Sequence, residues 1–343
     1  MSGAQGAPER NPDLDGLRGL AALAVAFGHC YEMATGLDLW GTRLSDFHTM
    51  SAGRIAARLI STLFPADAAV MVFFVLSGYV LWHSFHRKNM QFFRDLPGYV
   101  AARLYRLLPL TILTALPLGL VGHASAQELV RNMLLLSHGM NGVLWSLQVE
   151  MVASAVLFVL WAVCKGSPWK LALGLALTIA TLPFNRGNPL VMFLPPFVLG
   201  AAIPLLPARV WHSRTLLAGG IMLLLFTNVF LGHGKFDRCL EIGGAVLLVG
   251  AVSQGRLPFL HHRVPLFLGA ISYPFYLTHV LGLMAAQPLM AGLHLASPYA
   301  DFAMRAALSI PPTLLLAWAL HHLVEVPVQR AAPRLAWPAR AVG

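Results

Sequence analysis

The sequence predicts an all-α fold, a polytopic bundle of about ten transmembrane helices, and two observations support this class. The first is composition, because 57% of the 343 residues are hydrophobic and only 11% are charged. Soluble domains carry about 25% charged residues, so this chain lacks the polar surface that would cover it in water. The second is the length of its apolar runs, since a spanning helix needs about 20 mainly apolar residues.

Ten segments approach the length of a membrane span. The fifth is short, and prolines interrupt the fifth and the sixth, so the ends of this pair stay open. The predicted spans are residues 17–36, 66–85, 104–122, 143–164, 171–184, 190–206, 215–232, 239–254, 266–285 and 303–324.

The distribution of basic residues predicts the orientation of the bundle. If the N-terminus is cytoplasmic, 16 of the 24 Lys and Arg residues fall on the cytoplasmic side, as the positive-inside rule requires. We therefore expect both termini in the cytoplasm (N-in, C-in). The chain then divides into a cytoplasmic tail (1–16), a membrane domain (17–325) and a second cytoplasmic tail (326–343).

The net charge of +10 does not indicate a nucleic-acid partner. The basic residues are scattered between apolar runs, whereas nucleic-acid binding requires a basic stripe or patch. Cys30, Cys164 and Cys239 lie in or beside apolar segments and lack the spacing of a disulfide framework or a metal site. We expect the lipid bilayer as a partner, no nucleic acid and no bound metal.

Ionisable residues inside the predicted spans are the candidates for function, because such groups are costly in a bilayer. Arg18 and His29 are eleven positions apart, which is close to three helical turns, so they share one face of the first span. Counted at 1.5 Å per residue, Glu150 and His279 lie about 10 Å below the outer surface. His29 lies at a similar depth. We expect these three side chains to share one layer.

A carboxylate beside an imidazole fixes its tautomer, and a neutral imidazole so held can take a proton from a hydroxyl. We therefore expect Glu150 to orient His29. The simpler alternative is that each histidine packs or bonds a backbone carbonyl. A proton-coupled secondary transporter or flippase for a polar solute could use the same groups as a proton relay.

Two further motifs have both a structural and a functional interpretation. Arg103 and Arg106 are three residues apart and share a helix face. They either anchor the helix orientation or clamp phosphate groups. Ser77 and Tyr79 flank a glycine in mid-helix, where small residues allow close helix packing or a serine hydroxyl can reach a substrate.

Several stretches together resemble the integral-membrane acyltransferase 3 family, whose members O-acylate bacterial glycans. They occur in the family's order and spacing from about Asp15 to Gln329. The matching stretches are "DGLRGLAALAVAFGH", "VFFVLSGYVL", "ARLYRLLPL", "WSLQVE", "GAISYPFYLTH" and "LVEVPV".

The resemblance implies a protein of the bacterial inner membrane that moves an acyl group, often acetyl, from cytoplasmic acyl-CoA to a glycan or glycolipid hydroxyl. Acyl-CoA is then a co-substrate, no cofactor is bound, and a protein of the glycan pathway is a possible partner. The roles implied are catalytic for Arg18, His29 and Glu150, acyl-CoA binding for Arg103 and Arg106, and support of the substrate for Ser77, Tyr79, Trp145 and His279.

The chain departs from the family's pattern in its second span. Many members have an acidic residue two positions before the Phe-Phe pair, where this chain has Met71, so the role of that acid is missing or moved to Asp67. The acyl group could pass to the acceptor directly, with His29 as general base, or through an acyl-imidazole on His29. Both routes stay open.

Overall fold

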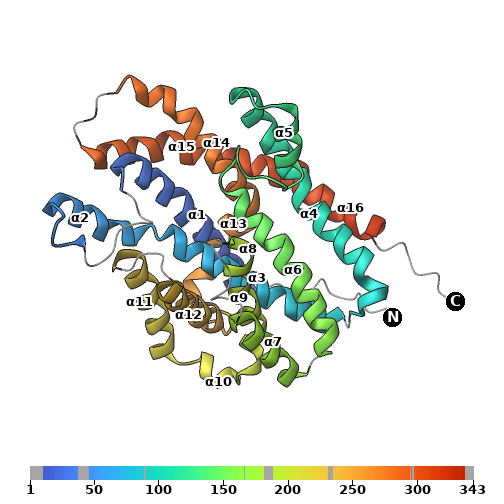
Figure 1. Cartoon of the computed structure of the whole chain (residues 1–343). Coiled ribbons are helices and arrows are strands. Elements are labelled where there is room, and N and C mark those ends of the chain that lie inside the picture. Colours follow the sequence, from blue (N-terminus) through green and yellow to red (C-terminus); the bar gives the residue numbers. More distant parts are fainter. Residues whose placement is uncertain are drawn as a thin grey trace.

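The computed structural model describes residues 11–37, 46–88, 90–165, 167–180, 188–230, 235–293, 295 and 297–336. Within these ranges every regular element is a helix, so the all-α class is confirmed (Figure 1). The main helices of the first half are α1 (Pro12–Thr35), α2 (Ala52–Ile60), α3 (Ala66–Lys88), α4 (Phe92–Val121), α5 (Ala126–Met133), α6 (Leu144–Cys164) and α7 (Pro168–Ala180).

The second half begins with three short helices and continues with longer ones, interrupted by a further short helix. These are α8 (Pro189–Met192), α9 (Leu194–Ala202), α10 (Ala208–Trp211), α11 (Arg214–Phe230), α12 (Lys235–Val252), α13 (Arg263–Ala270), α14 (Ser272–Ala291), α15 (Pro298–Leu320) and α16 (Val326–Ala336). Single short turns of 3-10 helix occupy Ser61–Leu63, Ile203–Leu205 and Pro258–His261.

The number of spans differs from the sequence expectation. Each of the ten predicted segments overlaps a helix, but four continuous helical stretches of the described chain are long and apolar enough to cross a membrane. A bent pair of helices, α13 with α14, brings the total to as many as five. The structure therefore shows an apolar helical bundle with several candidate spans, and the count of ten and the N-in, C-in orientation stay predictions.

The fifth and sixth predicted segments explain part of this difference. The fifth becomes α7, which has 13 residues. The sixth becomes α8, α9 and a short 3-10 turn, because prolines open the helical hydrogen-bonding pattern. Residues 181–187, which join the two segments, lie outside the described residues.

Helix α1 lies at the centre of the bundle and packs against α3, α13, α14 and α15 (Figure 1). Gly19 faces α13 so closely that a Cβ there would meet the backbone nitrogen of Gly269 at 2.3 Å, and a Cβ at Gly16 would lie 2.5 Å from the carbonyl oxygen of Leu260 in the preceding 3-10 turn. The two glycines therefore allow this turn and α13 to lie directly on the first turns of α1. Arg18, between them in sequence, takes a different direction and lines a cavity.

Helices α3 and α9 also meet through glycines. A Cβ at Gly78 would lie 2.0 Å from the carbonyl oxygen of Phe197, and a Cβ at Gly200 would lie 2.0 Å from that of Val75. Close backbone approach of this kind is typical of packing between membrane helices. It fixes α3, and with it Ser77 and Tyr79 on either side of Gly78.

A break between α13 and α14 places the start of α14 inside the bundle. The two helices are bent by 77°, so Ser272 and Tyr273 at the start of α14 lie at the pocket described below. Broken helices at membrane depth are tolerated where they are buried in protein or line a cavity.

The predicted C-terminal tail begins as an ordered helix. A π-helical turn over His321–Glu325 joins α15 to α16, and α16 packs against α4. The domain boundaries at residues 16 and 325 stay predictions, and residues 1–10 and 337–343 of the predicted tails lie outside the described residues.

Candidate active site

A cavity of about 590 Å³ opens beside the start of α1, the end of α3 and the start of α16. Three arginines face it from different helices: Arg18 on α1, Arg87 on α3 and Arg106 on α4. Within the described chain, neither Arg87 nor Arg106 has an ion-pair or hydrogen-bond partner. The volume falls in the range of ligand pockets, about 300–1,000 Å³. This cavity, which we call the vestibule, can therefore admit an anionic ligand.

The vestibule also carries polar groups that temper its positive charge. Arg18 Nη1 donates to Asp15 Oδ1 at 2.8 Å. On the opposite wall, His321 Nδ1 and Glu325 Oε2 lie 2.7 Å apart across the π-helical turn. The ring of Tyr79 stacks on that of His83 at the same cavity, with 6.1 Å between centroids.

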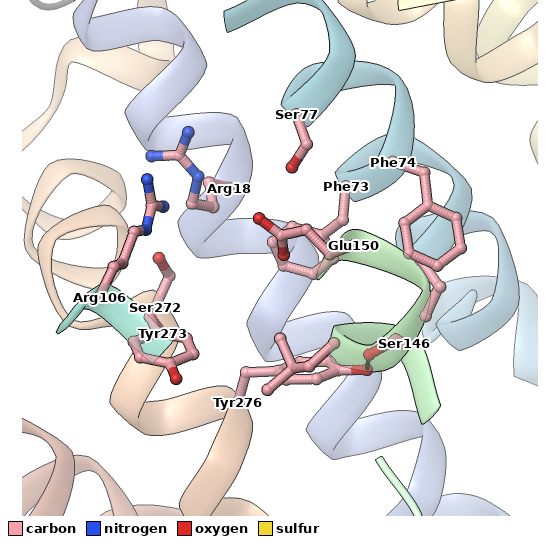
Figure 2. A pocket seen from close by; sticks show the side chains of 12 residues that line it. Arg18, Phe73, Phe74, Ser77, Arg106, Ser146, Glu150, Ser272, Tyr273 and Tyr276 are labelled. Atoms are coloured by element: carbon pink, nitrogen blue, oxygen red, sulfur yellow. Dashed lines mark hydrogen bonds between the residues drawn. The ribbon is translucent and has the colours of Figure 1, made fainter. Parts of the chain in front are cut away.

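A narrower pocket of about 60 Å³ adjoins the vestibule and shares four of its lining residues. Arg18 and Arg106 line both spaces, so they stand at the junction. Figure 2 shows their guanidinium groups on one side of the pocket and the Glu150 carboxylate and Ser77 hydroxyl on the other. The arrangement forms a passage that leads from the cationic vestibule to a buried carboxylate.

Glu150 forms an ion pair with Arg103 inside the bundle. Arg103 Nη2 donates to Glu150 Oε1 at 2.8 Å, and the two side chains are 7% and 18% exposed. The expectation that Glu150 orients His29 is therefore corrected, because the carboxylate beside His29 is Glu32, one turn along α1. Its Oε2 lies 3.5 Å from His29 Nδ1.

The structure also separates the two arginines of the predicted phosphate clamp. Arg106 faces both cavities, whereas Arg103 is 6% exposed and directed to Glu150. A residue that pairs with a buried carboxylate has fewer donors left for a ligand. Of this pair, Arg106 is the better placed to contact phosphate from the vestibule.

The inner end of the narrow pocket is closed by side chains of α6 and α14. Tyr276 and Ser146 both line it, and their hydroxyl oxygens lie 2.9 Å apart (Figure 2). Tyr273 donates to the backbone carbonyl of Leu107 at 2.7 Å and so ties the start of α14 to α4. The two tyrosines fix α14 against the helices that carry Glu150 and Arg106.

His29 and His279 meet beyond Tyr276. Their rings are stacked with 5.4 Å between centroids and an interplanar angle of 13°, so their predicted proximity is confirmed. The Tyr276 ring lies 5.8 Å from that of His279. Tyr276 therefore lies both at the narrow pocket and beside the imidazole pair.

The tautomer of neutral His279 follows from its hydrogen bond. Its Nδ1 lies 2.7 Å from the carbonyl oxygen of Tyr276, which can only accept, so Nδ1 carries the proton. Nε2 then has a lone pair. It is buried and has no hydrogen-bond partner. His29 differs, since its side chain is 35% exposed.

The remaining predicted residues have distinct surroundings. Ser77 lines the narrow pocket beside Glu150, and Tyr79 lines the vestibule. Trp145 lines neither space; its ring packs against Phe74 and Phe193, with 5.9 Å and 4.9 Å between centroids. Trp145 therefore packs α6 against α3 and against the start of α9. The roles of all these residues stay predictions.

Several lining residues were missed in the sequence. The stretches "WSLQVE" and "GAISYPFYLTH" contain Ser146, Tyr273 and Tyr276. The sequence marks these stretches as motifs, but it does not indicate that the three hydroxyl groups line a pocket. Arg87 is one of the 16 basic residues whose distribution predicts the orientation, and nothing else in the sequence marks it as a lining residue. Glu32 lies three residues after His29, a spacing that places two side chains on one helix face.

An apolar helical bundle with several candidate membrane spans and a cationic cavity beside buried ionisable groups is the architecture expected of an integral-membrane enzyme. A family model described as an acyltransferase domain, of the acyltransferase 3 type, matches residues 11–322. The chain belongs to this family and is an acyltransferase.

Two curated relatives carry names of the same activity. The chain is 28% identical to acyltransferase MdmB of Streptomyces mycarofaciens, over 95% of this chain and 93% of the relative. It is 25% identical to "Putative acetyltransferase ORF330" of Acidianus two-tailed virus, over 79% of this chain and 83% of the relative. No solved structure matches the chain at a significant level.

Proposed function

We propose that this chain is a membrane O-acyltransferase that moves an acyl group from acyl-CoA to a hydroxyl of a cell-envelope or exported glycan. The acyl group that we propose is acetyl. The proposal places it in the bacterial inner membrane with the vestibule toward the cytoplasm. The observation that carries it is that Arg18 and Arg106 line both the vestibule and the narrow pocket, which Glu150 also lines.

The donor enters by the vestibule. Coenzyme A carries several phosphate groups, which guanidinium groups bind through charge-assisted hydrogen bonds. Arg87 and Arg106 have no described partner and can make such bonds. The pantetheine arm is narrow and mostly neutral, so it suits the small pocket beyond the junction, between Ser77 and Tyr273.

The transfer step takes place near the imidazole pair once the Tyr276 side chain moves aside. The acceptor hydroxyl gives its proton to His29 while its oxygen attacks the thioester carbonyl. A C–O bond forms, the C–S bond breaks, and the imidazolium returns the proton to the departing thiolate. General-base assistance of this type contributes about 10² to 10⁴ in rate.

Glu150 has a different role in this scheme from the one the sequence suggested. Paired with Arg103, it keeps that guanidinium away from the passage and leaves Arg106 and Arg18 as the cations at the junction. It is therefore a positioning residue for the donor channel. The carboxylate that can orient His29 is Glu32.

Radiolabelled acetyl-CoA added to the purified protein with a bacterial envelope-glycan extract tests the proposal. We expect label in the glycan with the wild-type protein and none with His29→Ala. His48→Ala serves as the matched control, since His48 is exposed and lines neither cavity. Glycan labelling that persists in His29→Ala removes His29 from the mechanism. If no preparation, including the wild-type protein, labels the glycan, the proposed function is refuted.

A further inference from the structure

The end of α1 opposite the vestibule carries a second cluster of titratable groups. His29 and Glu32 are about one-third exposed, 35% and 33%, and lie 3.5 Å apart. Asp67, in the first turn of α3, is close enough to both to interact electrostatically. His279 stacks on His29 from α14. Three helices therefore bring this cluster, which we call the acceptor cluster, to one place.

The hydrogen-bonding capacity of the acceptor cluster is one-sided. An ionised carboxylate only accepts hydrogen bonds, and a neutral imidazole has a single donor. In His279 that donor is used by the Tyr276 carbonyl, and the remaining atom, Nε2, is a buried acceptor without a partner. Because Nδ1 turns back to its own helix, Nε2 lies on the far side of the ring. A ligand here must supply hydrogen-bond donors.

Glu32 is the charged group that stands nearest to His29 in the acceptor cluster, with 3.5 Å between its Oε2 and His29 Nδ1. Two arginines of neighbouring helices pair with carboxylates of their own helix, Arg238 with Glu241 on α12 and Arg305 with Asp301 on α15, and Arg238 also interacts electrostatically with Asp67. An acceptor that approaches neutral His29 therefore meets the negative charge of Glu32, which attracts a cation and repels an anion.

We propose that the hydroxyl compound acylated at His29 carries hydrogen-bond donors and no negative charge beside the reacting hydroxyl. The site then prefers an amino sugar to a neutral sugar, and a neutral sugar to a uronic acid. Glu32 contacts the ammonium group of the amino sugar. The inference rests on the proposed function, because it takes His29 as the place where the hydroxyl reacts.

Binding of three matched glycosides to the purified full-length protein tests this inference without requiring turnover. Octyl glucosaminide, octyl glucoside and octyl glucuronide differ in one substituent, and thermal stabilisation near neutral pH gives an apparent Kd for each. We expect the glucosaminide to bind about five-fold more tightly than the glucoside, the effect of one partly exposed charge pair. The glucuronide should bind most weakly, and added salt should reduce the differences.

Glu32→Gln should bring the ratio of the glucosaminide and glucoside Kd values close to one, whereas Glu32→Asp should retain the preference. Glu128→Gln is the matched control, since Glu128 is an exposed carboxylate on α5 that lines neither cavity. The inference is overturned if the three glycosides bind equally, if none binds, or if the glucuronide binds most tightly. It is also overturned if the ratio of the Kd values is unchanged in Glu32→Gln. If acetyl transfer to glycan still occurs in those cases, the proposed function stands and the acceptor preference alone is refuted.

Discussion

Arg103 and Glu150 are held together inside the bundle, with Arg103 Nη2 2.8 Å from Glu150 Oε1 and both side chains largely buried. The pair joins α4 to α6 at the wall of the donor passage. It also explains why two arginines three residues apart differ in their surroundings. Arg103 is turned to the carboxylate, and Arg106 faces the cavities.

Replacing one member of this pair should destabilise the protein more than replacing both. Glu150→Leu leaves the buried Arg103 charge uncompensated, which costs about 3–5 kcal/mol, whereas an apolar pair at both positions can be nearly neutral. Thermal unfolding of Glu150→Leu, Arg103→Leu and the double variant measures this. Additive losses in the double variant would show that the two side chains act separately.

Arg106 should contribute to the binding of the acyl-CoA donor. Arg106→Gln removes a charged donor at the junction of the two cavities, and a hydrogen bond to a charged group is worth about 1.5–3 kcal/mol. We expect the KM for acetyl-CoA to rise by about ten-fold or more. Steady-state kinetics check this, with Arg94→Gln as control because Arg94 on the same helix lines neither the vestibule nor the narrow pocket. An equal rise in both variants would remove Arg106 from the donor site.

Nε2 of His279 should matter for the reaction of the acceptor and not for donor binding. His279→Phe retains an aromatic ring against His29 and removes the free acceptor atom. We expect kcat/KM for the glycan acceptor to fall while the KM for acetyl-CoA stays within about two-fold, since Nε2 lies on the acceptor side of the site. Wild-type kcat/KM for the acceptor in this variant would mean that His279 serves packing alone.

Gly78 should be intolerant of even a methyl group. Alanine there would put Cβ 2.0 Å from the Phe197 carbonyl oxygen, so α3 and α9 would have to separate. Overpacking typically costs about 1–3 kcal/mol. Gly219→Ala on α11 is the matched helical control, because no atom lies within 4 Å of its added Cβ. Thermal unfolding that is equally affected in both variants would show that the close contact is not the cause.

The sequence predicted the helical class, the membrane character and most helix positions, because these depend on composition and apolar run length. It could not predict how many helices span the bilayer. The bend between α13 and α14 and the division of residues 189–205 into short helices arise from tertiary packing and proline geometry. Neither changes the mean hydropathy of the segment.

The sequence predicted those features of the candidate site that depend on position along one helix, and not those that depend on packing between helices. Helical periodicity predicted that Arg18 and His29 share one face of their helix. Counting residues from the predicted membrane surface placed His29 and His279 at the same depth, and their rings are stacked in the structure. Depth counting cannot give the rotation of a helix about its axis, however. It therefore could not show that Glu150 turns toward Arg103 and that Glu32 is the carboxylate beside His29.

The central claim is that an acyl group passes from a thioester in the cationic passage to a glycan hydroxyl at His29. Mass spectrometry of cell-envelope glycans tests it most directly, in bacterial cells that carry the wild-type protein, His29→Ala or no copy of the chain. We expect O-acylated glycan with the wild-type protein, and its loss in the other two strains while His29→Ala remains in the membrane at wild-type level. Identical glycan acylation in the three strains would contradict the account.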